Sequence, residues 1–172
     1  NTGIAGSGRL ENEGLLETAP WGGGCCGFAR LAVPTHSVAG AEIRVVSGAQ
    51  LLLEDGARLD LDGTLVVGGF LGIPGGGTSR AISLRPGSAV NGAGLMRLNG
   101  ANRLTVFGEV GLSCQLELPD QSRLDGSGTL RLLPAQQTRG GDQTAIGGII
   151  HIQVQAKPVV IINIQPMSMM KT

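Results

Sequence analysis

The sequence is poor in aromatic residues, with one Trp, three Phe and no Tyr among its 172 residues. Each aromatic side chain normally buries a large area in a core, so here Leu, Val, Ile and Ala must fill the interior. Small, uniform aliphatic side chains suit regularly stacked layers better than an irregular core. The shortage of aromatic rings also counts against a polysaccharide-cleaving enzyme, whose groove usually stacks such rings on sugars.

An excess of either charge is also missing, because 13 Lys and Arg residues balance 13 Asp and Glu residues along the chain. No basic block predicts a nucleic-acid partner, and no acidic tail predicts a solvating segment. No apolar run reaches the roughly 18 residues of a membrane span, so no membrane partner is expected. With 41% hydrophobic residues the chain is still too apolar to stay disordered.

Cysteines are few and poorly spaced for chemistry: Cys25, Cys26 and Cys114. An odd number with two adjacent members does not predict a secreted disulfide framework, and free thiols fit a reducing cytoplasm. Cys25 and Cys26 also lack CxxC spacing and an obvious histidine partner, so a catalytic thiol is not expected. No secretory signal precedes them, and the chain does not begin with Met.

Glycine is the residue in excess, with 30 copies, and its placement is regular. Gly40, Gly48, Gly56 and Gly63 are separated by 8, 8 and 7 residues. Each unit carries a short apolar alternation, which is typical of β-strands. The alternating residues are Ile43, Val45, Leu51, Leu53, Leu59, Leu61, Leu65 and Val67. Glycine permits the positive φ of a tight corner, and the small Ala that usually follows fits inside it.

A second array shows the same regular spacing of glycines, with Gly92, Gly100 and Gly108 separated by 8 and 8 residues. Three units of 8, 8 and 7 residues sum to a 23-residue coil, so we predict an all-β protein built as a β-helix or solenoid-like stack. Two arrangements stay open: one chain forms a complete coil by itself, or three chains wound about one axis share the units of each coil. A trimer is expected. The alternative is a β-sandwich or jelly roll with many short hairpins.

Three regions follow from this pattern. Residues 1–39 are predicted to be an irregular N-terminal arm and loop, and residues 40–133 the β-helical body. Residues 134–172 are predicted to be a C-terminal β-strand pair and tail, because "IIHIQVQ" and "VVIINIQ" alternate on either side of a proline. Those two strands are expected to pair with each other or with partner subunits.

Candidate contact residues lie outside the repeats. Trp21 and Phe28 flank the glycine-cysteine loop and either anchor it on a neighbour or cap the core. Polar side chains alternate on one C-terminal strand, and methionines crowd an adaptable tail. These contact candidates are Trp21, Phe28, His151, Gln153, Gln155, Met167, Met169 and Met170.

Residues that would indicate a metal, a cofactor or catalysis are sparse. Threefold symmetry could gather three copies of His151 around a metal, but no second ligand lies nearby, so a solvated histidine is expected. Asp55, Asp60 and Asp62 read as surface turns, since the glycine-rich nonapeptide of calcium-binding rolls is missing. Nothing brings Asp120 and Asp125 together as an acid and base pair. We therefore expect no cofactor, no metal and no catalytic residue.

The units "GAQLLLEDGARLDLDGTLVV" and "GSGTLRLL" resemble coils of β-helical viral fibre, spike and decoration proteins. They also resemble "GxLxNxGxL" passenger repeats of bacterial adhesins, as "GSGRLENEGLL" does, but those chains are long and follow a signal. The resemblance covers Gly40 to Leu133 and implies a bacteriophage structural protein rather than an enzyme. The leading expectation is a homotrimeric capsid decoration (cement) protein that binds the major capsid protein or other virion subunits and is assembled in the host cytoplasm.

Three alternatives stay open. The chain is similar to a tail or head fibre or spike segment, which would share the same virion partners. A β-helical lyase or hydrolase acting on polysaccharide would need clustered acids and bases in a groove. The short Gly-punctuated coils are also similar to bactofilin-like filament proteins, which would assemble from this chain alone.

Overall fold

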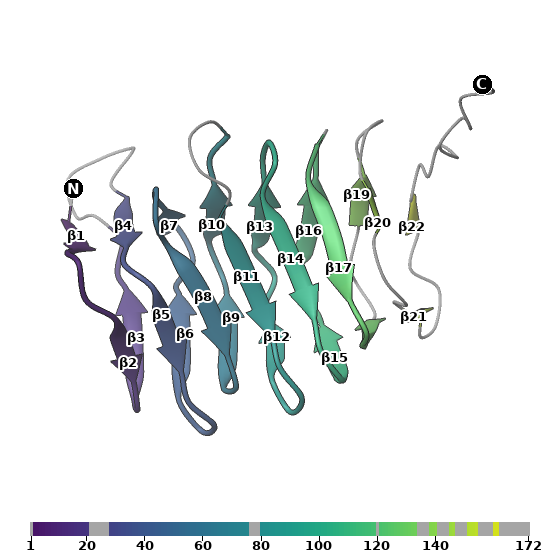
Figure 1. The fold of residues 1–172 in the computed structure, drawn as a ribbon, viewed down its shortest axis with the longest axis horizontal. Helices are drawn as coiled ribbons and strands as arrows, with labels where there is room; N and C mark the ends of the chain where they lie inside the picture. Colours follow the sequence, from purple (N-terminus) through teal and green to yellow (C-terminus); the bar gives the residue numbers. More distant parts are fainter. Residues whose placement is uncertain are drawn as a thin grey trace.

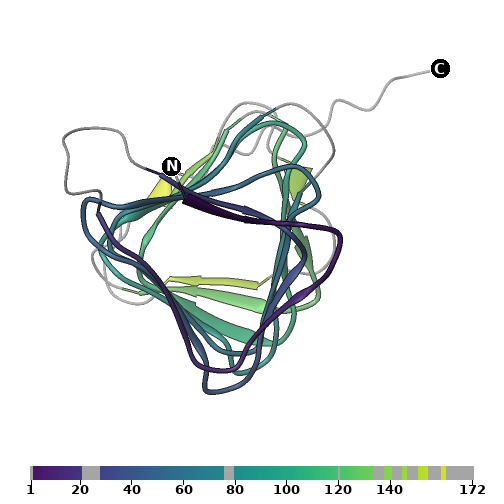
Figure 2. The same ribbon diagram turned by 90° about the vertical axis from the view of Figure 1, so that its left-hand side faces the viewer.

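The computed structural model describes residues 2–20, 28–75, 80–119 and 121–133, and the backbone of four short strands at 138–140, 145–146, 151–154 and 160–161. In these residues the chain forms only short strands that wind into a solenoid, coil upon coil from β1 to β22 (Figure 1). Seen along its axis the solenoid is roughly triangular, with one sheet on each side (Figure 2).

Three parallel sheets, named A, B and C here, form the sides of the triangle. Sheet A contains, in spatial order, β1 (Thr2–Ala5), β4 (Ala29–Ala32), β7 (Gln50–Leu53), β10 (Phe70–Ile73), β13 (Leu95–Leu98), β16 (Gln115–Leu118), β19 (Thr138–Gly140) and β22 (Val160–Ile161). Sheet B contains β2 (Leu10–Asn12), β5 (Thr35–Ser37), β8 (Arg58–Leu61), β11 (Ala81–Leu84), β14 (Arg103–Val106), β17 (Arg123–Gly126) and β20 (Ala145–Ile146). Sheet C contains β3 (Leu15–Thr18), β6 (Glu42–Val45), β9 (Thr64–Val67), β12 (Ala89–Asn91), β15 (Glu109–Leu112), β18 (Thr129–Leu132) and β21 (His151–Val154).

The parallel pairing confirms the predicted all-β solenoid and excludes the sandwich of hairpins, whose neighbouring strands would run antiparallel. The coils vary in length around the expected 23 residues. Ala29 pairs with Thr2 and with Leu51, which are 27 and 22 residues away. Leu71 pairs with Leu51 and with Met96, at 20 and 25 residues. The corners absorb this variation, so the strands keep their register.

One continuous aliphatic core fills the prism because alternate strand residues point inward. Leu59, Leu65 and Ile82, for example, have no exposed surface. A buried leucine or isoleucine gains about 1.5–3 kcal/mol by leaving water. Each coil also buries the core of its neighbours, so the stack as a whole is stabilised.

The corners explain the spacing of the glycines. Gly40, Gly48 and Gly56 have φ angles of 85°, 78° and 84°, and the Ala after each is buried. This confirms the positive-φ interpretation at these three corners. Gly63 has a different role, since a Cβ there would lie 2.2 Å from the carbonyl oxygen of Ala41 in the preceding coil. Steric contact between coils, rather than backbone conformation, requires glycine at that position.

The prediction of an irregular arm over residues 1–39 needs correction, because β1 to β5 lie in this region and continue all three sheets. The alternation of apolar and polar residues is hard to recognise in this region. Asn12, Thr18, Thr35 and Ser37 occupy inward positions and are buried, although their side chains are polar. Asn12 Nδ2 donates to Ser37 Oγ at 3.0 Å and to the carbonyl of Glu42 at 3.0 Å, so these polar groups satisfy one another.

The C-terminal strands also differ from the expectation that they pair with each other. β21 pairs with β18 in sheet C, and β22 pairs with β19 in sheet A. β21 and β22 thus belong to different sheets, as successive strands of the described coils do. Within the described residues the two strands therefore extend the solenoid instead of forming a separate pair.

Candidate functional site

Charged side chains on the described outer surface are mostly paired, and many pairs join neighbouring coils. The cross-coil pairs include Arg30–Glu54, Arg44–Glu17, Arg97–Glu117, Arg103–Asp125 and Arg131–Glu109. Each such exposed pair contributes about 0.2–1 kcal/mol at most. Together they connect adjacent strands of all three sheets from outside, while the aliphatic core connects them from inside.

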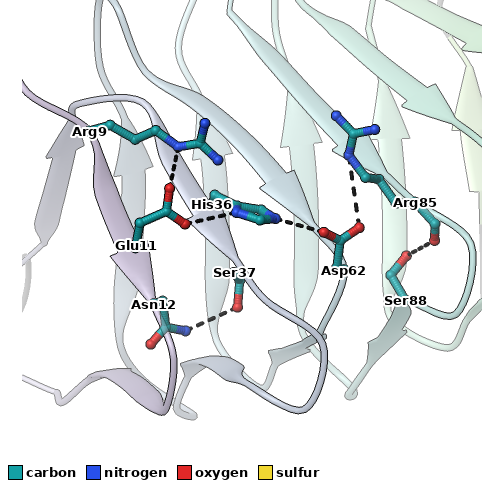
Figure 3. Close-up of polar contacts among 8 residues, drawn as sticks. All are labelled: Arg9, Glu11, Asn12, His36, Ser37, Asp62, Arg85 and Ser88. Carbon is teal, nitrogen blue, oxygen red and sulfur yellow. Dashed lines mark hydrogen bonds and ion pairs between the residues drawn. The ribbon is translucent and has the colours of Figure 1, made fainter.

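The most extended polar cluster is centred on His36, on the outer face of sheet B (Figure 3). His36 Nδ1 lies 2.8 Å from Glu11 Oε2, and His36 Nε2 lies 2.7 Å from Asp62 Oδ2. Arg9 Nε contacts Glu11 at 2.7 Å, and Arg85 Nε approaches Asp62 at 3.9 Å. The cluster thus alternates in charge along the solenoid, with His36 joining strand β2 to the corner after β8.

The two carboxylates favour the charged form of this histidine. The hydrogen bond to Asp62 raises the pKa of His36 above its usual 6.5, and Glu11 raises it further, although burial opposes them. In its charged form the ring donates from both nitrogens, so that form has no lone pair for accepting a proton or binding a metal. Since the carboxylates lie at opposite ring nitrogens, they do not converge on one point. The arrangement suits a bridge between coils better than a catalytic centre.

A pocket of about 400 Å³ lies at the N-terminal end of the solenoid, between sheets A and C. Its lining is mainly apolar and includes Ile4, Leu16, Leu31 and Phe28. The guanidinium of Arg30 stacks over the Phe28 ring, 4.6 Å from the ring centroid. Phe28, expected as a contact residue, is therefore half-buried beside this opening of the core.

A buried arginine supports the corner between β10 and β11. The Arg80 side chain is only 4% exposed; it donates to the Pro74 carbonyl at 2.5 Å and pairs with Asp55. Its backbone N–H donates to Asn102 Oδ1 at 3.0 Å. These contacts join Arg80 to Asp55 of the preceding coil and to Asn102 of the following coil. A structural role accounts for this buried charge.

The described residues offer little to nucleophilic or metal chemistry. Burial raises the pKa of the Cys114 thiol to about 12, so this thiol stays protonated and unreactive at neutral pH. In the described part of the chain, no three His, Cys, Asp or Glu residues are gathered as a metal ion would require. Nor does that part contain a helix long and apolar enough to cross a membrane.

The predicted contact residues are only partly placed. His151 and Gln153 lie on β21 at positions in register with Thr129 and Arg131 of β18. Five other candidates, together with Cys25 and Cys26, fall outside the described residues. Those five are Trp21, Gln155, Met167, Met169 and Met170. Of the described candidates, His151 and Gln153 share strand β21, whereas Phe28 lies at the other end of the solenoid, and their role as contact residues stays a prediction.

Sequence reasoning missed the His36 cluster. Its partners are separated from it by 25 and 26 residues, close to one coil length. A search for opposite charges one coil apart would have found them once the coil length was known. The variable corners hid that length, because no single period fits all coils.

Searches against protein-family models, curated proteins and solved structures find no match for this chain. The fold and the surface charges are thus the observations on which a function can be based.

Proposed function

We propose that this chain is a structural, non-enzymatic component of a bacteriophage virion, namely a homotrimeric capsid decoration protein. The observation that supports this most is the use of surface charge. In the described coils, acidic and basic side chains mainly pair with each other between neighbouring strands rather than converge on a cleft. Such pairing, together with a continuous aliphatic core, favours a stiff body that provides mechanical support.

The proposed mechanism is attachment by several weak contacts. Parallel sheets end in edge strands whose free backbone groups can pair with a strand of a neighbouring subunit. The major capsid protein or another virion subunit would supply that strand or a matching surface. Because a shell repeats the contact around its symmetry axes, individually weak contacts add up to firm attachment.

Two measurements test this proposal directly. Sedimentation of the purified chain at high salt should give the mass of a trimer, and the chain should co-sediment with empty phage capsids. A monomer that hydrolyses or cleaves polysaccharide, and that does not bind capsids, would overturn it. The part of the virion that retains the chain distinguishes capsid decoration from a tail or head fibre.

One observation favours a second candidate, a filament formed from this chain alone. At the N-terminal end, β1, β2 and β3 each have a described neighbour on one side only. Leu15 and Ile4 at this end are 56% and 38% exposed. Electron microscopy of the purified chain would show filaments if coils stack end to end, and Leu15→Lys should shorten them.

A further inference from the structure

Unpaired charges are rare on the described surface, and they are concentrated on one face. Among the charged side chains that the structure describes, four make no ion pair: Glu13, Arg58, Asp60 and Arg123. Three of these lie on the outer face of sheet B, and Glu13 lies at a corner of the first coil. On the described parts of sheets A and C, the charged side chains all make ion pairs within the chain.

Arginines on this face share a single strand position. Arg58 of β8 is in register with Ala81 of β11, Ala81 with Arg103 of β14, and Arg103 with Arg123 of β17. All three arginines are exposed. They form a basic column that runs parallel to the solenoid axis, across strands that lie side by side in Figure 1.

An acidic column lies beside the basic one, two residues further along the same strands. Asp60 is in register with Ser83, Ser83 with Thr105, and Thr105 with Asp125. Residues two apart in a strand point to the same side and are separated by about 7 Å. Asp60 therefore stands beside Arg58 in one coil, and Asp125 beside Arg123 in another.

We propose that this face of sheet B docks against the same face of a second copy, with the two solenoids parallel. A two-fold axis parallel to the solenoid axis keeps every coil at its own level and reverses the order of the columns. The basic column of one copy then faces the acidic column of the other. Arg58 meets Asp60 of the second copy and Asp60 meets its Arg58, as an isologous interface requires.

Charge selects this orientation over its alternative. A two-fold axis along the strands would place the basic columns against each other, and the acidic columns likewise, which is repulsive. A polyanion is a poorer occupant because Asp60 and Asp125, which stand beside Arg58 and Arg123 at the two ends of the column, would repel its negative charges. Asp125 already pairs with Arg103 at 2.8 Å, so Arg58 and Asp60 carry most of the predicted contact.

The contact is small, so the predicted association is weak and sensitive to salt. Four strand residues span about 13 Å, and six stacked strands span about 24 Å, which gives roughly 600 Å² for both copies together. Stable complexes usually bury at least about 1,200 Å². Such a face matters where copies are held at high local concentration, for example on beads or between neighbouring trimers on a shell.

Charge reversal tests the proposal. Tagged chains immobilised on beads should capture free wild-type chain at low salt, and about 0.5 M salt should release it, because the pairs are exposed. Arg58→Asp and Asp60→Arg should each lower self-capture at least about tenfold. Each variant carries two charges of the same sign at positions 58 and 60, and these would face each other across the two-fold axis. Mixing these two variants should restore capture, because each then offers the charges that the other lacks. The Arg58→Asp/Asp60→Arg double variant should also capture itself.

Glu13→Arg is the matched control, because it makes the same charge change as Asp60→Arg outside the face. It should leave self-capture unchanged. The proposal is overturned if wild-type chain shows no salt-sensitive capture, if single reversals capture as well as the wild type, or if mixing does not restore capture. Capture of a polyanion such as heparin that Arg58→Asp abolishes, without self-capture, would also overturn it. The trimer mass at high salt is measured separately, so a failure here is distinguishable from a failure of the proposed function.

Discussion

The first two coils and the central coils share one backbone arrangement but fill their interiors differently. In the centre, inward positions hold aliphatic residues such as Leu59, Leu65 and Ile82, all without exposed surface. In the first coils, Asn12 and Ser37 hold equivalent inward positions, also buried. These polar side chains bond to each other and to backbone carbonyls.

The difference shows that alternation of direction, rather than hydrophobicity, defines a coil of this solenoid. A buried polar group is tolerated when a partner satisfies it, but the net gain from each hydrogen bond is only about 0.5–1.5 kcal/mol. Burying an aliphatic side chain contributes about twice that. The central coils should therefore be the stable part of the molecule, and the first coils the part that opens most easily.

The largest effect should come from the central core. Leu84→Ala removes a side chain with no exposed surface from the middle of sheet B. The lost burial and the remaining cavity should lower the free energy of unfolding by about 2–5 kcal/mol. Urea denaturation followed by circular dichroism measures this loss. A loss below about 1 kcal/mol would mean that the central core is not tightly packed.

The second-largest loss of stability is expected where the backbones of neighbouring coils touch. A Cβ at Gly94 would lie 2.1 Å from the carbonyl oxygen of Gly69, so Gly94→Ala should destabilise the fold by about 1–3 kcal/mol. Gly8→Ala is the control, because a Cβ there would meet nothing within 4 Å. Equal thermal unfolding temperatures for the two variants would contradict the close stacking of β10 and β13.

A more local effect is expected at the polar interior. Asn12→Ala leaves Ser37 Oγ and the Glu42 carbonyl without this donor, which should cost about 1–2 kcal/mol. Since the loss is confined to the first coils, limited digestion with trypsin should accelerate after Arg9 and remain slow after Arg103. Faster cleavage at both sites would mean that the two regions unfold together.

The smallest effect is the pH dependence conferred by His36. Its folded pKa is raised above the usual 6.5, so its contribution is complete below pH 6.5 and is lost as the pH rises through the folded value. The ring is 20% exposed, and the contribution should stay under about 1 kcal/mol. His36→Gln should remove this slope from the urea midpoint measured between pH 5 and about 9, whereas the His151→Gln control should retain it. A slope that survives in His36→Gln would contradict the bridge.

The repeated part of the fold was predictable because each strand carries its own signal. Apolar alternation marks Leu59 and Leu61 as inward, and glycine marks the corners, whatever the length of the coil. Two features were not predictable. Polar residues at inward strand positions, such as Asn12, make the sequence of these strands look like that of a loop. The partners of His36 lie one coil away, and the variable length of the corners changes how many residues that distance spans. Pairing across coils is information that no short stretch of sequence contains.

The proposed docking face illustrates the same point. Arg58 and Asp60 look like ordinary surface residues in the sequence, since their columns appear only when β8 is set in register with β11 and β14. Which charges stay unpaired also depends on that register. A function made from repeated surface contacts is therefore visible only after the coils have been aligned.

The central claim is that one prism extends through both regions, with polar and apolar interiors alike. Amide hydrogen exchange of the wild-type chain tests it most directly. The account predicts the strongest protection in β8, β11 and β14, and weaker but clear protection in β2 and β5, whose amides pair in the same sheet. Exchange of β2 and β5 at the rate of an unstructured peptide would contradict the account, because residues 1–39 would then be an arm and not part of the solenoid.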